Sequence, residues 1–111
     1  MQIPKPTDGD KDRFRSLVPD DPRVAVKPMF GNLGAFVNGN MFMGLFGSDV
    51  GVKLPPDGAA ELMAVEGAAP FGPAERPMGG YVTLPPAYLA GEEWRPWVQG
   101  ALDHVATMKP K

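Results

Sequence analysis

The stretch "VKPMFGNLGAFVNGNMFMGLFG", residues 26–47, contains five glycines, four phenylalanines and three methionines around one Asn-Gly pair. Asn38-Gly39 is a strong hairpin signal, because a type I′ turn needs positive φ at both of its central residues. Apolar residues on either side of the pair favour extended chain. We therefore predict two antiparallel strands over residues 33–37 and 40–46, joined by this two-residue turn.

The register of the hairpin follows from its turn. A two-residue loop is expected to place Gly34 opposite Met43 and Ala35 opposite Phe42, and likewise Leu33 opposite Gly44. Each small residue would then face a large one, which lets the large side chain lie over its partner. The glycines of the stretch do not spell G-x-G-x-x-G and no helix is expected after them, so they do not predict a phosphate-binding loop.

Further strands are predicted on both sides of this hairpin. Residues 24–30 form an apolar run that contains Pro28, and proline within a strand indicates an edge position or a bulge. Residues 50–54 and 81–84 are two more apolar runs, and each ends at a pair of prolines. The sheet is therefore expected to contain four or five strands.

Three helices are predicted. Phe14, Leu17 and Val18 have the spacing of one helical face. A second helix is expected from Gly58 to about Glu66, with Asp57 as its N-cap.

The third helix has the clearest pattern. Its apolar residues recur with helical spacing over four turns: Trp94, Trp97, Val98, Ala101, Leu102, Val105 and Met108. Pro96 is tolerated only in a first turn, so this helix is expected to begin near Glu92 or Glu93.

The order of elements is α-β-β-β-β-α-β-α. Strands joined by tight turns favour an antiparallel sheet, and helices gathered on one face of it give a two-layer α+β domain. A chain of 111 residues has the length of one domain. We expect a flexible N-terminal leader over residues 1–9 and a single domain over residues 10–111.

Composition excludes several classes of function. The net charge is −2, so the basic footprint of a nucleic-acid-binding protein is absent, and we expect no direct nucleic-acid binding. The chain has no cysteine, which excludes disulfides and thiolate catalysis. No apolar run approaches the length of a membrane span. We expect a cytoplasmic protein that does not associate with membranes.

No catalytic or metal-binding constellation is found. The single histidine, His104, lies at the edge of the apolar stripe of the last helix, where a packing role is typical. A zinc site needs three or four ligands, which one histidine does not supply. The two serines, Ser16 and Ser48, do not lie in a nucleophile elbow. We therefore expect no catalytic residues, no metal and no cofactor.

Two lysines and the methionines are candidates for binding. Lys27 and Lys53 are each the single charge of an otherwise apolar strand. The simpler interpretation places them on the solvent face of the sheet; the alternative is a groove in which both hold an anionic group. The methionines suit an adaptable binding surface, but we favour a sheet face packed under the tryptophans Trp94 and Trp97.

Five segments together carry a family resemblance. "KPMFGNLGAFVNGNMFMGLFG", "VKLPP", "APFGP", "RPMGGYVTLPP" and "WRPWVQGAL" resemble, in order and spacing, the TfoX N-terminal domain family over residues 14–102. The resemblance implies a two-layer α+β fold similar to secretion-chaperone-like folds. The family's namesake regulates natural competence, acts with the transcription machinery and carries a second, helical domain. This chain is expected to be a stand-alone single-domain member, and the family offers no catalytic residues to carry over.

Three hypotheses of function follow. The first is a non-enzymatic, regulatory interaction module that binds a protein partner or itself. The second is a small-molecule or anion-binding domain that uses Lys27 and Lys53. The third is a small enzyme of unknown reaction. The candidate ligand or partner surface consists of Lys27, Met29, Phe30, Lys53 and Tyr81.

Overall fold

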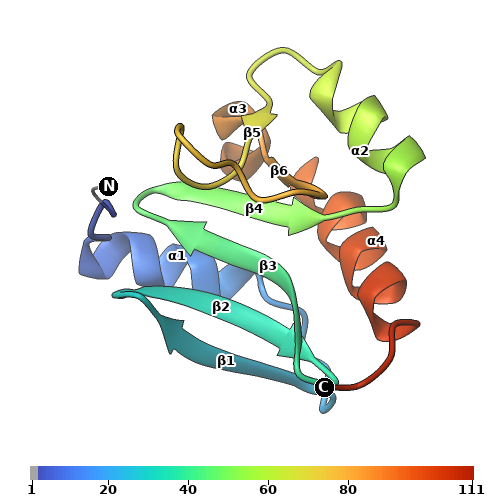
Figure 1. Cartoon of the computed structure of the whole chain (residues 1–111). Coiled ribbons are helices and arrows are strands. Elements are labelled where there is room, and N and C mark those ends of the chain that lie inside the picture. Colours follow the sequence, from blue (N-terminus) through green and yellow to red (C-terminus); the bar gives the residue numbers. More distant parts are fainter. Residues whose placement is uncertain (1–2) are drawn as a thin grey trace.

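The computed structural model describes residues 3–111. A six-stranded antiparallel sheet of strand order β1-β2-β3-β4-β6-β5 is packed against four helices (Figure 1). The elements, in chain order, are α1 (Asp8–Leu17), β1 (Val24–Met29), β2 (Asn32–Val37), β3 (Asn40–Phe46), β4 (Asp49–Lys53), α2 (Pro56–Met63), β5 (Ala69–Pro70), β6 (Tyr81–Thr83), α3 (Pro86–Ala90) and α4 (Trp94–Ala106).

Strands β1 to β4 form a meander with two-residue turns. The predicted turn at Asn38-Gly39 joins β2 to β3, with φ of 54° and 78° at the two residues, as a type I′ turn requires. The β1–β2 turn, Phe30-Gly31, has the same signature, with φ of 50° and 81°. Local turn chemistry therefore sets the connection of the first three strands.

A β-bulge changes the register that the sequence predicts for β2 and β3. Next to the turn, Phe36 faces Met41 as expected, but the register then shifts by one residue. Ala35 consequently faces Met43, and Gly34 faces Gly44, so the expected pairs were wrong. The cause is one extra residue in β3, which a bulge inserts without changing the turn.

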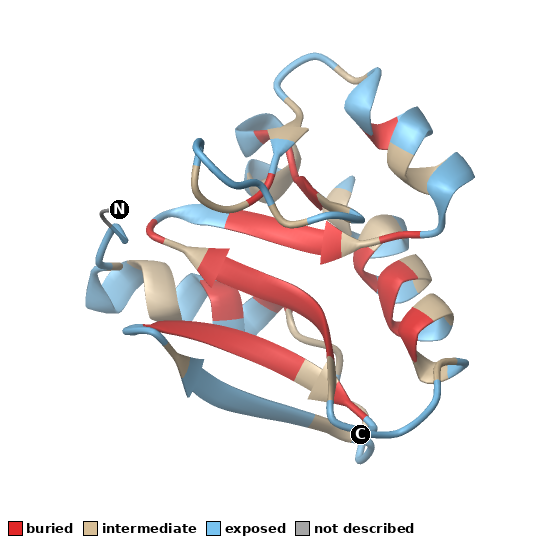
Figure 2. Ribbon diagram, in the orientation of Figure 1, coloured by how far each residue is buried: buried red, intermediate tan, exposed pale blue. Residues whose placement is uncertain are grey.

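The core lies between one face of the sheet and the helices (Figure 2). Phe14 and Leu17 of α1 lie in it, as does Leu62 of α2. Strands and α4 supply most of the remaining buried side chains: Leu33, Ala35, Val37, Phe42, Met43, Leu45, Val50, Val52, Val82, Val98, Ala101, Leu102 and Val105. The two-layer α+β architecture is therefore confirmed.

Several details differ from the prediction. The sheet has six strands rather than four or five, because the two-residue strand β5 also pairs with β6. Helix α2 begins at Pro56, with Pro55 as N-cap, so Asp57 lies inside the first turn. Helix α3 was not predicted. Helix α4 begins directly after its N-cap Glu93, close to the expected start.

The N-terminal residues contact the domain. Thr7 caps α1 in a capping box with Asp10, and α1 begins at Asp8. The side-chain amide of Asn32 donates to the carbonyl of Pro4 at 3.1 Å. The flexible leader over residues 1–9 stays a prediction, and residues 1 and 2 lie outside the described part.

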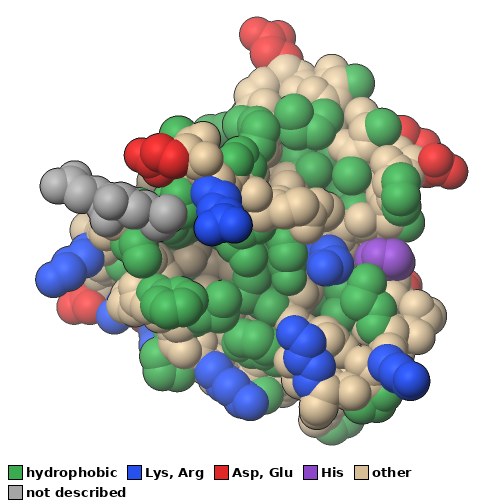
Figure 3. All heavy atoms as spheres, in the orientation of Figure 1, with side chains coloured by type: hydrophobic (Ala, Val, Ile, Leu, Met, Phe, Trp, Pro, Cys, Tyr) green, Lys and Arg blue, Asp and Glu red, His purple; other side chains and the backbone are tan. Residues whose placement is uncertain are grey.

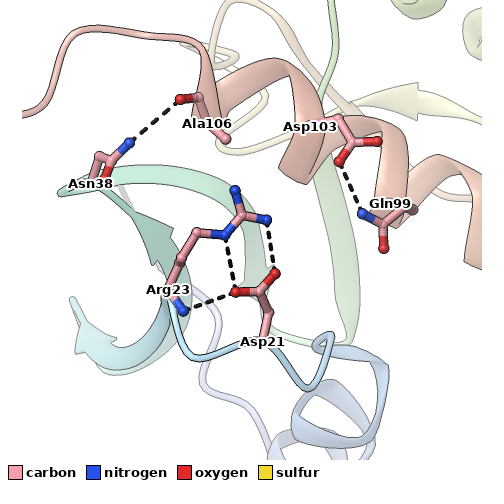
Figure 4. A network of polar contacts seen from close by, with 6 residues as sticks. All are labelled: Asp21, Arg23, Asn38, Gln99, Asp103 and Ala106. Carbon is pink, nitrogen blue, oxygen red and sulfur yellow. Dashed lines mark hydrogen bonds and ion pairs between the residues drawn. The ribbon is translucent and has the colours of Figure 1, made fainter.

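Two polar contacts lie at the end of the β1–β2–β3 unit where β1 begins beside the β2–β3 turn (Figure 4). Before β1, the guanidinium of Arg23 donates to both carboxylate oxygens of Asp21, at 3.0 and 2.8 Å. At the β2–β3 turn, the Asn38 side chain donates to the carbonyl of Ala106 at 3.4 Å. The bond from Asn38 links the β2–β3 turn to the last residue of α4, whereas the Arg23–Asp21 pair is local.

No helix among residues 3–111 combines the length and the apolar character that crossing a bilayer requires.

Candidate functional site

In the described part of the chain, one face of the sheet carries no helix (Figure 1). Strand register identifies its residues, because side chains alternate between faces and paired residues share a face. Gly34 pairs with Gly44, and Gly44 pairs with Gly51, so three glycines form a row across β2, β3 and β4. Lys27 pairs with Gly34 and extends this row onto β1. We call this side of the sheet the open face.

The glycine row allows large side chains to lie flat on the open face. A Cβ atom at Gly51 would lie 2.3 Å from the ring of Phe71, and a Cβ atom at Gly34 would lie 2.9 Å from the sulfur of Met41. Phe71 belongs to the segment that crosses in front of β4 in Figure 1. It is only 2% exposed, because its ring lies on Gly51 and near the aromatic rings of Phe46 and Tyr81, at centroid distances of 6.1 Å.

A cavity of about 420 Å³ opens on this face. Gly44 forms part of its floor, and the 71–78 segment forms one wall. Its volume lies in the range of ligand pockets, roughly 300–1,000 Å³. The lining residues are mainly apolar: Ile3, Met29, Phe30, Asn32, Leu33, Met41, Gly44, Leu45, Phe46, Phe71, Pro73, Arg76 and Met78.

Phe30 is the most exposed large apolar residue at the cavity. It is 78% exposed and has a φ of 50°, although the first position of a type I′ turn favours Asn, Asp or Gly. A left-handed conformation costs an ordinary L-residue roughly 1–2 kcal/mol. Phe30 therefore occupies a backbone conformation that disfavours it, and its aromatic ring stays exposed to solvent. Such a conflict marks a position whose side chain is a candidate for contact with something outside the fold.

Basic side chains surround the apolar centre of the open face. The Lys27 ammonium lies 5.5 Å from the centre of the Phe36 ring, and that of Lys53 lies 5.1 Å from the centre of the Tyr81 ring. Arg76 lines the cavity. Within residues 3–111, none of these three cations forms an ion pair. Figure 3 shows the same arrangement, with acidic side chains at the margins of the view.

Tyr81 has a structural contact on this face. Its hydroxyl donates to the main-chain carbonyl of Met41 at 2.7 Å, next to the bulge in β3. Burial raises the pKa of the Tyr81 phenol above its usual value of 10.0. The neutral, hydrogen-bonded phenol therefore holds the bulge in place.

The structure distributes the five predicted surface residues as follows. Met29 and Phe30 line the cavity. Lys27, Lys53 and Tyr81 lie on the same face outside its lining, and both lysines thus share one side of the sheet.

The methionines do not follow our preferred interpretation. Met43 is buried in the core under the helices, but Met29, Met41 and Met78 lie around the cavity on the opposite side. The bulge separates Met41 from Met43 in this way, because the extra residue changes which face each side chain takes. Met78 and Arg76 were missed, and only their position near a Pro-Gly-rich loop pointed to surface exposure.

Both edges of the sheet are poorly suited to pairing with a further strand. In an antiparallel pair, every second residue of a strand directs its main-chain groups toward the partner strand. In β1 the residues in between, Val24, Val26 and Pro28, direct theirs away from β2 and toward the open edge. Pro28 has no N–H, and the N–H of Val24 donates to the carbonyl of Asp21 at 3.0 Å. At the other edge, β5 has two residues and one is proline. Such features protect an edge from strand addition.

The rest of the described chain offers little chemistry. Within residues 3–111, no group of three His, Asp or Glu side chains is arranged to hold a metal ion. A second hollow of about 570 Å³ lies between the end of α1 and α4, beside Asp20, Asp21 and Arg95. Its Asp21 carboxylate is already paired with Arg23.

Sequence comparison adds one positive result. The TfoX N-terminal domain family matches residues 15–105, from α1 to the last turn of α4, and this range includes all six strands. A search of curated proteins gave no match, and neither did a search of solved structures. The family match spans most of the chain, and it agrees with the resemblance carried by the glycine-rich hairpin and its neighbours. The chain belongs to the TfoX N-terminal domain family.

Proposed function

We propose that this domain is a non-catalytic interaction module that binds an acidic, apolar segment of a protein partner on its open face. Phe30 carries the proposal. An aromatic ring that is 78% exposed, on a backbone conformation that disfavours it, contributes little to folding and much to a contact surface. Aromatic residues are enriched at the energetic centres of protein interfaces.

The blunted edges favour a contact made through side chains. Pro28 and the bonded N–H of Val24 leave Val26 as the residue of β1 with an outward N–H that has no bond within the described chain. A partner strand would therefore find few main-chain groups to pair with. The open face, by contrast, presents Phe30 beside an apolar cavity.

Charge favours an acidic partner. Lys27, Lys53 and Arg76 lie on or beside this face, although the whole chain has a net charge of −2. Complementary charge at the rim of an interface raises the association rate and disfavours wrong partners. A second copy of this chain would bring the same cations together, so self-association through this face is disfavoured.

Photo-crosslinking tests the proposal. A benzoylphenylalanine replaces Phe30 in the full chain in cells, and in a matched variant it replaces Met63, which is 42% exposed on α2 and lies outside the cavity lining. The expected result is one partner, identified by mass spectrometry, that crosslinks from position 30 and not from position 63. Equal crosslinking from both positions, self-crosslinking only, or no crosslink would overturn the proposal.

A further inference from the structure

We propose that the cavity on the open face is a binding site for a small amphipathic carboxylate. Its apolar part would lie over Gly44, and its carboxylate would pair with Arg76. This goes beyond the proposed interaction with a protein, because the ligand is a free small molecule that lies inside the cavity, whereas the protein contact is made by the exposed ring of Phe30 at the edge of its lining.

The polar groups of the cavity define the class of ligand. Among the described residues, 3–111, two that line the cavity have polar side chains, Asn32 and Arg76. The Asn32 amide nitrogen already donates to the carbonyl of Pro4, and its oxygen accepts from the N–H of Gly47 at 2.8 Å. Asn32 is therefore engaged in holding the chain together. Arg76 is the remaining polar side chain, and within residues 3–111 its guanidinium has no hydrogen bond or ion pair.

One guanidinium at the rim of an apolar cavity favours a ligand with one anionic end. None of the described lining residues is Asp or Glu, so these residues offer a cationic ligand no charged partner. A guanidinium fits a carboxylate through two parallel hydrogen bonds, which are stronger than bonds between neutral groups. Lys27 and Lys53 share the open face and add positive potential toward an approaching anion.

The size and the lining set the length of the ligand. At roughly 30 Å³ for each water-sized group, a cavity of about 420 Å³ holds on the order of 14 non-hydrogen atoms. That is the size of a medium-chain fatty acid or a small aromatic acid. Met29, Met41 and Met78 surround the space, and methionine adapts its shape to different apolar groups. The site therefore fits a class of carboxylates rather than one rigid compound.

The same methionines provide the readout. The purified full chain is labelled with ¹³C at the methionine methyl groups and titrated with decanoate, below its micelle concentration, and separately with decanol. We expect the signals of Met29, Met41 and Met78 to shift with decanoate, while Met63 and Met108, which lie outside the cavity, stay unchanged. Decanol should bind roughly tenfold more weakly, because it leaves the guanidinium without a charged partner.

Two variants assign the roles of cation and floor. Arg76→Gln should weaken decanoate binding roughly tenfold and leave decanol binding unchanged, whereas Arg15→Gln, on the exposed side of α1, should change neither. Gly44→Ala should weaken both ligands, because its Cβ atom enters the floor beside Met41 and Phe71. The absence of shifts at the cavity methionines would overturn the proposal. It would also be overturned if decanoate and decanol bound equally well and Arg76→Gln bound decanoate as tightly as the wild type does. None of these measurements requires a protein partner, so this proposal and the proposed function fail separately.

Discussion

Replacing Phe30 by Asn is expected to stabilise the fold, although it removes an aromatic side chain. The gain comes from the turn, because Asn accepts positive φ more readily than Phe and the left-handed region costs roughly 1–2 kcal/mol. The loss is small. Phe30 is 78% exposed, so about a fifth of its roughly 200 Å² is buried. At about 25 cal/mol per Å² this burial is worth about 1 kcal/mol, and Asn retains part of it. The expected net gain is about 0.5–1 kcal/mol in the free energy of unfolding.

Urea denaturation of the wild type, Phe30→Asn and Phe30→Ala measures this balance. The alanine variant is the matched control, because it also removes the ring but is not favoured at positive φ. It should be less stable than the wild type, by up to about 1 kcal/mol, while the asparagine variant is more stable. If Phe30→Asn instead loses 1 kcal/mol or more, the ring of Phe30 is required by the fold, and its use as a contact residue loses its main support.

Three further predictions concern the sheet and its connections. Gly51→Ala should lower the free energy of unfolding by about 2–3 kcal/mol, because the new Cβ atom displaces the ring of Phe71. Urea denaturation measures this loss, and a loss below about 0.5 kcal/mol would contradict the close packing of Phe71 on Gly51. Tyr81→Phe should lower the free energy of unfolding by about 1 kcal/mol near neutral pH, because it removes the hydrogen bond from the Tyr81 hydroxyl to the carbonyl of Met41. Burial raises the pKa of Tyr81, so the stability that its neutral phenol contributes is complete below pH 10.0 and is lost as pH rises through the folded-state pKa. The difference in unfolding free energy between the wild type and Tyr81→Phe should therefore shrink at alkaline pH. A difference that stays constant would refute this. The Asp21 carboxyl should titrate with a pKa of about 2, chiefly because of the side-chain hydrogen bonds from Arg23. The stability that the ionised carboxylate contributes is therefore present above pH 3.8 and is lost as pH falls through about 2. Arg23→Gln should return this pKa part of the way to 3.8 in an NMR titration, and an unchanged pKa would refute the assignment to Arg23.

Local signals predicted the parts of the fold that depend on few residues. The Asn38-Gly39 pair placed the central hairpin, because positive φ at two successive residues is a requirement that few residue types meet. The apolar period of the last helix, together with Pro96, placed its start beside Glu93. Each of these features is determined within one turn or one helix face.

The bulge in β3 could not be predicted in the same way. The sequence around Phe42 fits both registers, since large apolar residues stand on either side of it. What selects the shifted register is tertiary: Gly34, Gly44 and Gly51 come into one row, and Tyr81 bonds the carbonyl of Met41 from a distant strand. This shift also moved Met41 to the open face.

The candidate site shows the same division. Lys27, Met29 and Phe30 lie within four consecutive residues and were singled out together. Phe71 and Arg76 come from a loop more than forty residues away, which only the pairing of β5 and β6 brings over the sheet. The cavity forms where residues 71–78 lie over the hairpin residues 29–46. No local sequence pattern predicts this long-range contact.

The dissociation constant of the partner that crosslinks from position 30 tests the central claim most directly. It is measured with the purified partner by calorimetry, for the wild type and for Phe30→Asn, whose thermal stability is checked in the same buffer. We predict at least tenfold weaker binding by a variant that is as stable as the wild type or more so, as expected for removal of an aromatic interface residue worth about 1.4 kcal/mol or more. Equal dissociation constants would contradict the assignment of the open face as the binding surface.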